Sequence, residues 1–186
     1  MIPAVFLDRD GTVIEHVHHL HRTEDVALIP GAAQAIRSLR SAGYLCVIVT
    51  NQSVVGRGML DIDGLDAIHD TMKHQLQAEM AELDGIYYCT VVPTTNDQSL
   101  IEHPDRKPGP GMLLKAAQDL QISLADSWMI GDSLSDLLAG QNAGCRESLL
   151  VLTGYGEKVR PLGGEEFRSF PSIQEAAKAI LAEVRC

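Results

Sequence analysis

Short apolar runs alternate with longer amphipathic segments along this chain of 186 residues. Five apolar runs with aromatic or β-branched members predict buried strands, at 5–7, 44–49, 85–89, 127–130 and 148–152. Apolar residues recur at helical spacing between and after them, at 30–43, 61–83, 111–120, 137–144 and 172–183. This alternation predicts an α/β fold, a doubly wound, Rossmann-like parallel sheet with helices on both faces. We expect a single domain over residues 1–186.

Polar residues follow the predicted strands. They are Asp8 and Asp10, Thr50 and Asn51, Arg106 and Lys107 within a loop over 90–110, and Asp132 and Asp136. The carboxyl ends of parallel strands meet at one edge of a sheet, where ligands of such folds bind. We therefore expect these side chains to converge on one site. A loop as long as 90–110 inside a compact domain is also typically functional.

Two carboxylates with nearby cations suit phosphoryl transfer. Asp8 is the candidate nucleophile, and Asp10 is placed to protonate the leaving alcohol and later to deprotonate water. A carboxylate that approaches a phosphate needs its charge neutralised. Lys107 and a Mg²⁺ ion, whose site Asp132 completes, would supply this.

Several of these residues have both a functional and a purely structural interpretation. Thr50 would hold phosphoryl oxygens, or it caps a turn together with Asn51. Asp136 lies one helical turn beyond Asp132 and would orient Lys107 or a metal-bound water. In the purely structural interpretation, Lys107 is a solvated charge on a loop and Asp132 is an ordinary helix N-cap. Their common position after strands favours the functional interpretation.

The composition limits the classes of function. Apolar residues make up 45% of the chain and charged residues 22%, as in a globular protein. The formal net charge of −10 argues against a nucleic-acid partner, and an anionic substrate would need a locally positive pocket. The N-terminus lacks a signal-peptide pattern, no apolar run reaches membrane-spanning length, and the four cysteines are scattered. We expect a cytoplasmic protein with reduced cysteines and no membrane partner, compatible with a monomer.

A cluster of four histidines lies in the polar segment 15–24, comprising His16, His18, His19 and His21. Such a cluster could bind a metal. Its spacing fits neither one face of a helix nor one face of a strand. We therefore expect a loop that lines or covers the neighbouring site.

Four motifs make the chain resemble the haloacid dehalogenase superfamily of phosphotransferases. They are FLDRDGT at 6–12, VTNQS at 49–53, RKP at 106–108 and GDSLSD at 131–136. The resemblance implies Asp8 as the nucleophile and Asp10 as the acid and base. It implies Mg²⁺ bound by Asp8, Asp132 and the main-chain carbonyl of Asp10, with Thr50 and Lys107 binding the phosphoryl group. The short loops fit a member without a large cap domain.

Two segments, LDGIYYC at 83–89 and RKPGPGM at 106–112, resemble the heptose-bisphosphate phosphatases and related histidinol-phosphatases within that superfamily. The resemblance implies hydrolysis of D-glycero-D-manno-heptose 1,7-bisphosphate or a similar sugar phosphate through an aspartyl phosphate. Histidinol phosphate or another small phosphomonoester is an alternative substrate, and a catalytically silent phosphosugar-binding protein is an alternative class. The implied substrate-binding set is Asn51, Gln52, Ser53, Arg106, His16, His18 and His19.

One departure from that group concerns zinc. The loop before the Arg-Lys pair holds zinc in the group through a Cys, a His and two further Cys. Here Cys89 is kept, but Val91 stands in place of the His, and His103 and Asp105 stand in place of the other two Cys. Because Val91 cannot ligate a metal and both thiolates are missing, we expect no zinc.

Two further departures concern the substrate. The substrate loop carries His18 and His19 where the group has Gly-Tyr, and Ser133 follows Asp132 where the group has Lys. These changes touch specificity and leave the phosphoryl-transfer residues intact. The sequence therefore predicts the chemistry more firmly than the substrate.

Overall fold

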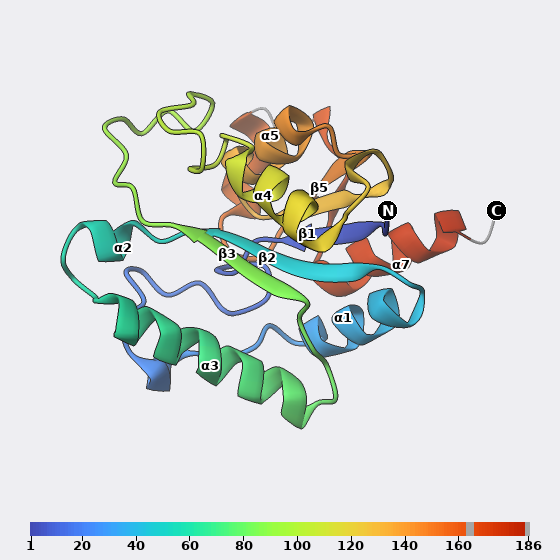
Figure 1. The fold of residues 1–186 in the computed structure, drawn as a ribbon, viewed down its shortest axis with the longest axis horizontal. Helices are drawn as coiled ribbons and strands as arrows, with labels where there is room; N and C mark the ends of the chain where they lie inside the picture. The colour runs from blue at the N-terminus through green and yellow to red at the C-terminus, as the bar shows by residue number, and fades with distance from the viewer. Residues whose placement is uncertain (163–165, 185–186) are drawn as a thin grey trace.

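The computed structural model describes residues 1–162 and 166–184, so Cys186, one of the four cysteines, lies outside the described residues. All the strands pair in parallel in one sheet, in the order β3-β2-β1-β4-β5-β6 (Figure 1). The strands are β1 (Ala4–Leu7), β2 (Leu45–Asn51), β3 (Gly85–Cys89), β4 (Trp128–Gly131), β5 (Glu147–Val151) and β6 (Ser169–Phe170). This order confirms the predicted doubly wound sheet.

Helices cover both faces of the sheet, as the alternation predicts. The helices are α1 (Ala32–Ser41), α2 (Ser53–Gly56), α3 (Ile62–Ala78), α4 (Gly111–Leu120), α5 (Leu134–Ala143), α6 (Gly156–Val159) and α7 (Ile173–Val184). Figure 1 shows α1, α3 and α7 on one side of the sheet and α4 and α5 on the other. The two main apolar clusters of the core match these layers. Strands covered on both faces explain why the strand sequences are almost wholly apolar.

Several predicted boundaries are corrected by the structure. The strand predicted at 44–49 spans Leu45–Asn51, so Thr50 and Asn51 are its last two residues and do not follow it. The helix predicted over 61–83 ends at Ala78, because Met80 adopts a φ of 58° and the amide of Ala81 turns back to the Leu76 carbonyl. The strand predicted at 148–152 spans Glu147–Val151. The short elements α2, α6 and β6 were not predicted, since two to four residues are too few to show a period.

The order in which successive strands are added to the sheet reverses between β1 and β4. The chain adds β2 and β3 on one side of β1, and then β4, β5 and β6 on the other side. The neighbours β1 and β4 pair from Val5 with Trp128 to Leu7 with Ile130, and each continues at its carboxyl end into an aspartate, Asp8 or Asp132. Open α/β sheets bind ligands at such a switch point. A search of the described residues finds no helix that is both long and apolar enough to span a bilayer.

Candidate active site

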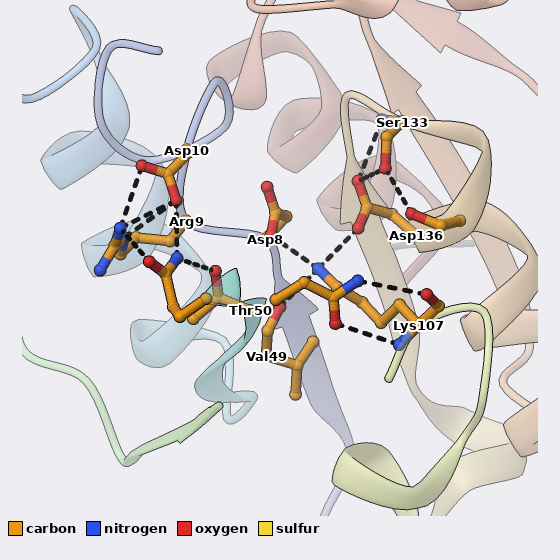
Figure 2. A network of polar contacts seen from close by, with 11 residues as sticks. Asp8, Arg9, Asp10, Val49, Thr50, Lys107, Ser133 and Asp136 are labelled. Carbon is orange, nitrogen blue, oxygen red and sulfur yellow. Dashed lines mark hydrogen bonds and ion pairs between the residues drawn. The ribbon is translucent and has the colours of Figure 1, made fainter. Parts of the chain in front are cut away.

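A buried lysine joins three segments of the chain at the carboxyl ends of the strands. The Nζ atom of Lys107 lies 2.6 Å from Oδ1 of Asp8 and 2.6 Å from Oδ1 of Asp136, and it donates to the Val49 carbonyl at 2.7 Å (Figure 2). Asn51 holds the main chain of Lys107 on both sides, accepting from its N–H at 3.1 Å and donating to its carbonyl at 3.2 Å. The long loop is thus fixed where it delivers its ammonium group.

Two glycines make room for Asp132. A Cβ atom on Gly11 would lie 2.2 Å from the Oδ2 atom of Asp132, and one on Gly154 would lie 2.0 Å from it. Both glycines also have a positive φ, of 82° and 58°. The amide of Tyr155 donates to the same oxygen at 2.7 Å, and the Thr153 hydroxyl donates to the Gly11 carbonyl at 2.6 Å. The turn after β5 therefore locks the Asp132 carboxylate against the turn after β1.

Asp8, Asp132 and Asp136 form an acidic cluster, in which one carboxylate oxygen from each residue lies within 4.8 Å of the other two. Burial raises the pKa of Asp8 to about 7, with Asp136 adding to the rise and Lys107 opposing it. Burial also raises the pKa of Asp132 above its usual range. For Lys107, burial disfavours the charged form, but the carboxylates of Asp136 and Asp8 outweigh it and raise its pKa. Three carboxylates facing one ammonium group fit a divalent cation that prefers oxygen ligands.

Asp10 points away from this cluster into a second network. Its carboxylate accepts hydrogen bonds from Arg9 and from Gln52 Nε2, and the same Gln52 nitrogen donates to the Thr50 hydroxyl at 2.8 Å (Figure 2). The two networks lie on opposite sides of Asp8 in the figure. A reacting group above Asp8 would thus meet an ammonium on one side and a carboxylate on the other.

An open cleft of about 160 Å³ lies over both networks. All the predicted catalytic and metal-binding residues line it, namely Asp8, Asp10, Thr50, Lys107 and Asp132. Asp136 lines it too, and so do two of the predicted substrate-binding residues, Asn51 and His16. Arg106 lines an adjoining cavity and donates to the Val91 carbonyl at 2.8 Å. The cleft lining does not include Ser53, His18 or His19; the two histidine rings stack on each other with centroids 3.9 Å apart.

Residues 105–169 match the family model described as HAD-hydrolase-like. The chain is 41% identical over 162 residues to the D-glycero-D-manno-heptose-1,7-bisphosphate 7-phosphatase of Thermosynechococcus vestitus, covering 84% of this chain and 82% of that one. It is 38% identical over 154 residues to the D-glycero-beta-D-manno-heptose-1,7-bisphosphate 7-phosphatase of Escherichia coli K12, covering 82% and 81%. The chain belongs to the HAD-like phosphatase family.

A crystal structure of the D,D-heptose 1,7-bisphosphate phosphatase from B. bronchiseptica, complexed with magnesium and phosphate, is similar to this phosphatase over almost its full length. The TM-score is 0.87 at 34% identity, over 98% of this chain and 99% of that one. The corresponding enzyme from Burkholderia thailandensis has a TM-score of 0.72 at 32% identity, over 96% and 98%. The family and fold expected from the four motifs are thereby confirmed.

Three residues of the cleft were not predicted from the sequence. The ring of Tyr155 contacts that of His16, with centroids 4.3 Å apart and a tilt of 58°, and Gln98 accepts from the amide of Leu134 at 3.1 Å. Ser135 also lines the cleft. Tyr155 lies in a Gly-rich turn directly after a strand, which is a signal that could have singled it out. Nothing local singles out Gln98, because its contact is with a residue 36 positions away.

Cys89 and His103 lie in the segment that would hold zinc in the related group. The Nδ1 atom of His103 accepts from the amide of Asp105 at 3.1 Å, and Cys89 is a buried free thiol. Within residues 1–162 and 166–184, Cys89 belongs to no group of three side chains that could hold a metal ion. Whether this phosphatase lacks zinc stays a prediction.

Proposed function

We propose that this phosphatase removes the 7-phosphate from D-glycero-D-manno-heptose 1,7-bisphosphate, with Mg²⁺ as its cofactor. The whole chain over 1–186 acts as one catalytic unit. The observation that carries the chemistry is the buried Lys107 ammonium between Asp8 and Asp136, beside the third carboxylate of Asp132. The substrate is supported by the names of relatives about 40% identical over most of the chain.

The reaction has two balanced steps. In the first, an oxygen of Asp8 bonds to phosphorus while the bond from phosphorus to the sugar oxygen breaks, and Asp10 gives its proton to the departing oxygen. This leaves an aspartyl phosphate and a sugar alcohol. In the second, a water oxygen bonds to phosphorus while the bond from phosphorus to the Asp8 oxygen breaks, and Asp10 takes a proton from that water. This releases inorganic phosphate and restores both aspartates.

Charge neutralisation makes the first step feasible. Lys107 offsets the negative charge of Asp8 and of the incoming phosphate. The donor set that would hold Mg²⁺ is the carboxylates of Asp8 and Asp132 with the main-chain carbonyl of Asp10. Bound Mg²⁺ would supply further positive charge at the transferring phosphoryl group. The Thr50 hydroxyl would donate to a phosphoryl oxygen.

The rest of the substrate would lie toward His16, Asn51 and Arg106. These side chains line the cleft and its adjoining cavity. The guanidinium of Arg106 is a cation that could meet a second phosphate there, whereas Ser133 stands where the related group has Lys. We therefore expect a weaker hold on the distal phosphate than on the reacting one.

Phosphate release from p-nitrophenyl phosphate with Mg²⁺, compared between wild type and Asp8→Asn, tests the chemistry. We expect turnover by the wild type and a loss of at least about 10³-fold in the variant, because the amide cannot form the acyl phosphate. Equal release from the two proteins contradicts the covalent step. No release from either would indicate a silent binding protein.

A substrate screen tests the sugar separately. Heptose 1,7-bisphosphate, heptose monophosphates and histidinol phosphate are compared by kcat/KM at one Mg²⁺ concentration. We expect the bisphosphate to be preferred, with the 7-phosphate released first. A preference for histidinol phosphate would remove the heptose assignment and leave the phosphatase chemistry standing.

A further inference from the structure

Arg9 is a fully buried arginine whose side chain folds back onto its neighbour Asp10. Its side chain is 1% exposed. The Nε atom donates to Oδ2 of Asp10 at 3.1 Å and the Nη2 atom donates to Oδ1 at 3.1 Å, a bidentate arrangement. Figure 2 shows the guanidinium on the far side of Asp10 from Asp8 and Lys107. Arg9 therefore binds the Asp10 carboxylate on the side away from Asp8 and Lys107, and the side that faces the cleft stays open.

Gln52 binds both Arg9 and Asp10 from the end of β2, whereas those two residues follow β1. Its Oε1 atom accepts from Arg9 Nη2 at 2.9 Å, and its Nε2 atom donates to Asp10 Oδ2 at 3.0 Å and to the Thr50 hydroxyl at 2.8 Å. Its main-chain amide donates to the Cys89 carbonyl at 2.7 Å, which anchors the residue. Each end of the side-chain amide has a partner of the right polarity, so its orientation is determined.

We propose that Arg9 and Gln52 are positioning residues that fix Asp10 and Thr50 for phosphoryl transfer. This inference rests on the proposed role of Asp10 as acid and base. Gln52 is 4% exposed and its amide is fully engaged, so it acts through its neighbours and not by touching substrate, in contrast to the role implied by the resemblance.

Two consequences follow for the reacting atoms. Oδ2 of Asp10 accepts from both Arg9 Nε and Gln52 Nε2, whereas Oδ1 accepts from Arg9 Nη2. A carboxylate oxygen has two lone pairs, so Oδ1 is the oxygen with room to exchange a proton with substrate or water. Because the Thr50 oxygen already accepts from Gln52, its own O–H is left to donate toward a phosphoryl oxygen.

Arg9 is a buried cation, so it needs a negatively charged partner. Burial, and then the charge of Arg9, lower the pKa of the nearby His69 to about 4, so His69 is neutral near neutral pH. Arg9 Nη1 and His69 Nε2 are both buried and without a hydrogen-bond partner in the structure. Once Asp10 has given its proton to the leaving group, its carboxylate balances the charge of this buried guanidinium.

The dependence of the rate on the leaving group tests the inference. The wild type, Asp10→Asn and Arg9→Met are compared on p-nitrophenyl phosphate, whose phenolate leaves without a proton, and on the sugar phosphate preferred in the screen, whose alkoxide needs one. The ratio kcat/KM reports the step in which the leaving group departs. We expect Arg9→Met to lower kcat/KM for the sugar phosphate about 10–100-fold and to leave that for the aryl ester within about threefold.

Arg40→Met is the matched control. Arg40 also makes a bidentate pair, with Asp84 at 3.2 and 2.9 Å, outside the cleft lining. It should lower thermal stability without changing the ratio between the two substrates. If Arg9→Met lowers kcat/KM equally for both substrates, or for neither, while Asp10→Asn is selective for the sugar phosphate, the positioning role is wrong and the role of Asp10 stands. If Asp10→Asn itself is not selective, both the role of Asp10 and this inference fail.

The isosteric variant Gln52→Glu tests the hydrogen bonds that Gln52 Nε2 donates to Asp10 and Thr50. A carboxylate there still accepts from Arg9 but no longer donates to Asp10 or Thr50. We expect a rise of about 10-fold in the KM of both substrates, through Thr50, together with an added loss for the sugar phosphate alone, through Asp10. Gln75→Glu, which removes an amide donor to the Val26 carbonyl away from the cleft, is the control. Unchanged kinetics in Gln52→Glu would overturn this part of the inference.

Discussion

The Nζ atom of Lys107 lies 2.6 Å from the Oδ1 atom of Asp136, and both side chains are 2% exposed. Lys107 comes from the long loop over 90–110 and Asp136 from the first turn of α5. Asp136 also accepts from the Ser133 hydroxyl at 2.6 Å and from its amide at 3.0 Å, so the helix end holds the carboxylate still. Asp136 thus holds in place the ammonium group that faces Asp8.

A double-mutant cycle should measure this pairing. Lys107→Met leaves three buried carboxylates without their cation, and Asp136→Asn removes one anion. In metal-free protein we expect each single variant to lower the free energy of unfolding, by about 3 kcal/mol for Lys107→Met. The double variant should be more stable than the sum of the two changes by about 1–3 kcal/mol. Urea unfolding of the four proteins gives the coupling, and additive losses would show that the pair is not a unit.

Magnesium should stabilise the folded chain through Asp132. A ligand that binds the folded state at about 100 times its Kd adds about 2.7 kcal/mol. For a chain of this size that corresponds to a rise of roughly 5–10 °C in the unfolding midpoint. We expect this rise in the wild type and its loss in Asp132→Asn, measured by thermal unfolding with and without Mg²⁺. Asp66→Asn, on α3 away from the cluster, should keep the rise; an equal rise in Asp132→Asn would place the cation elsewhere.

The parts of the fold and site that follow a period or a strand end could be predicted from the sequence. Val5 to Leu7 is a continuous apolar run, and a buried parallel strand must end where Asp8 begins. Asp132 follows another such strand in the same way. Because both strands run in one direction, their ends meet. The convergence of Asp8, Lys107 and Asp132 was therefore within reach of pattern alone, together with the loop that carries Lys107.

The direction of individual side chains could not be predicted. Arg9 stands between two acids in a turn, where a long cation normally reaches into solvent, yet it is buried by a contact with Gln52 from 43 positions away. Gln52 was expected to face substrate and instead faces Asp10. His18 and His19 lie outside the cleft lining and their rings stack on each other, so their expected contact with substrate stays a prediction. Each outcome depends on packing between segments that are distant in the chain, which no local pattern records.

His69 should make stability depend on pH. Its pKa falls from 6.5 to about 4 on folding, because burial and then Arg9 disfavour the imidazolium, with Asp10 opposing. In the unfolded chain His69 therefore binds a proton below about pH 6.5, whereas in the folded protein it binds one only below about pH 4. The stabilisation is present above the unfolded pKa and is lost as pH falls through this window.

The variant His69→Leu isolates this effect from that of the carboxylates. Between pH 7 and pH 4.5, the wild type should lose up to about 3 kcal/mol more of its free energy of unfolding than the variant. Urea unfolding at several pH values measures both. Parallel losses in the two proteins would show that His69 is protonated as easily when folded as when unfolded.

The loop over 90–110 is held by its own hydrogen bonds. Glu102 accepts from the amide of Thr94 at 2.8 Å and from its hydroxyl, Arg106 donates to the Val91 carbonyl at 2.8 Å, and Asp97 accepts from the amide and hydroxyl of Ser99. The bonds of Glu102 and Arg106 join the two arms of the loop, and those of Asp97 hold the segment between the arms. Because Val91 offers no ligand, we expect purified protein to contain no stoichiometric zinc.

Elemental analysis of protein purified without chelator tests this directly. Treatment with a zinc chelator followed by addition of Mg²⁺ should restore full activity. A second experiment removes the bond between the two arms of the loop. The variant Glu102→Ala should raise the KM of the sugar phosphate roughly 3–10-fold, because the loop carries Arg106 and Lys107 to the cleft. Asp126→Ala, an acid outside the loop, is the control. About one zinc per chain, lost together with activity on chelation, would contradict the prediction and implicate Cys89 and His103 as ligands.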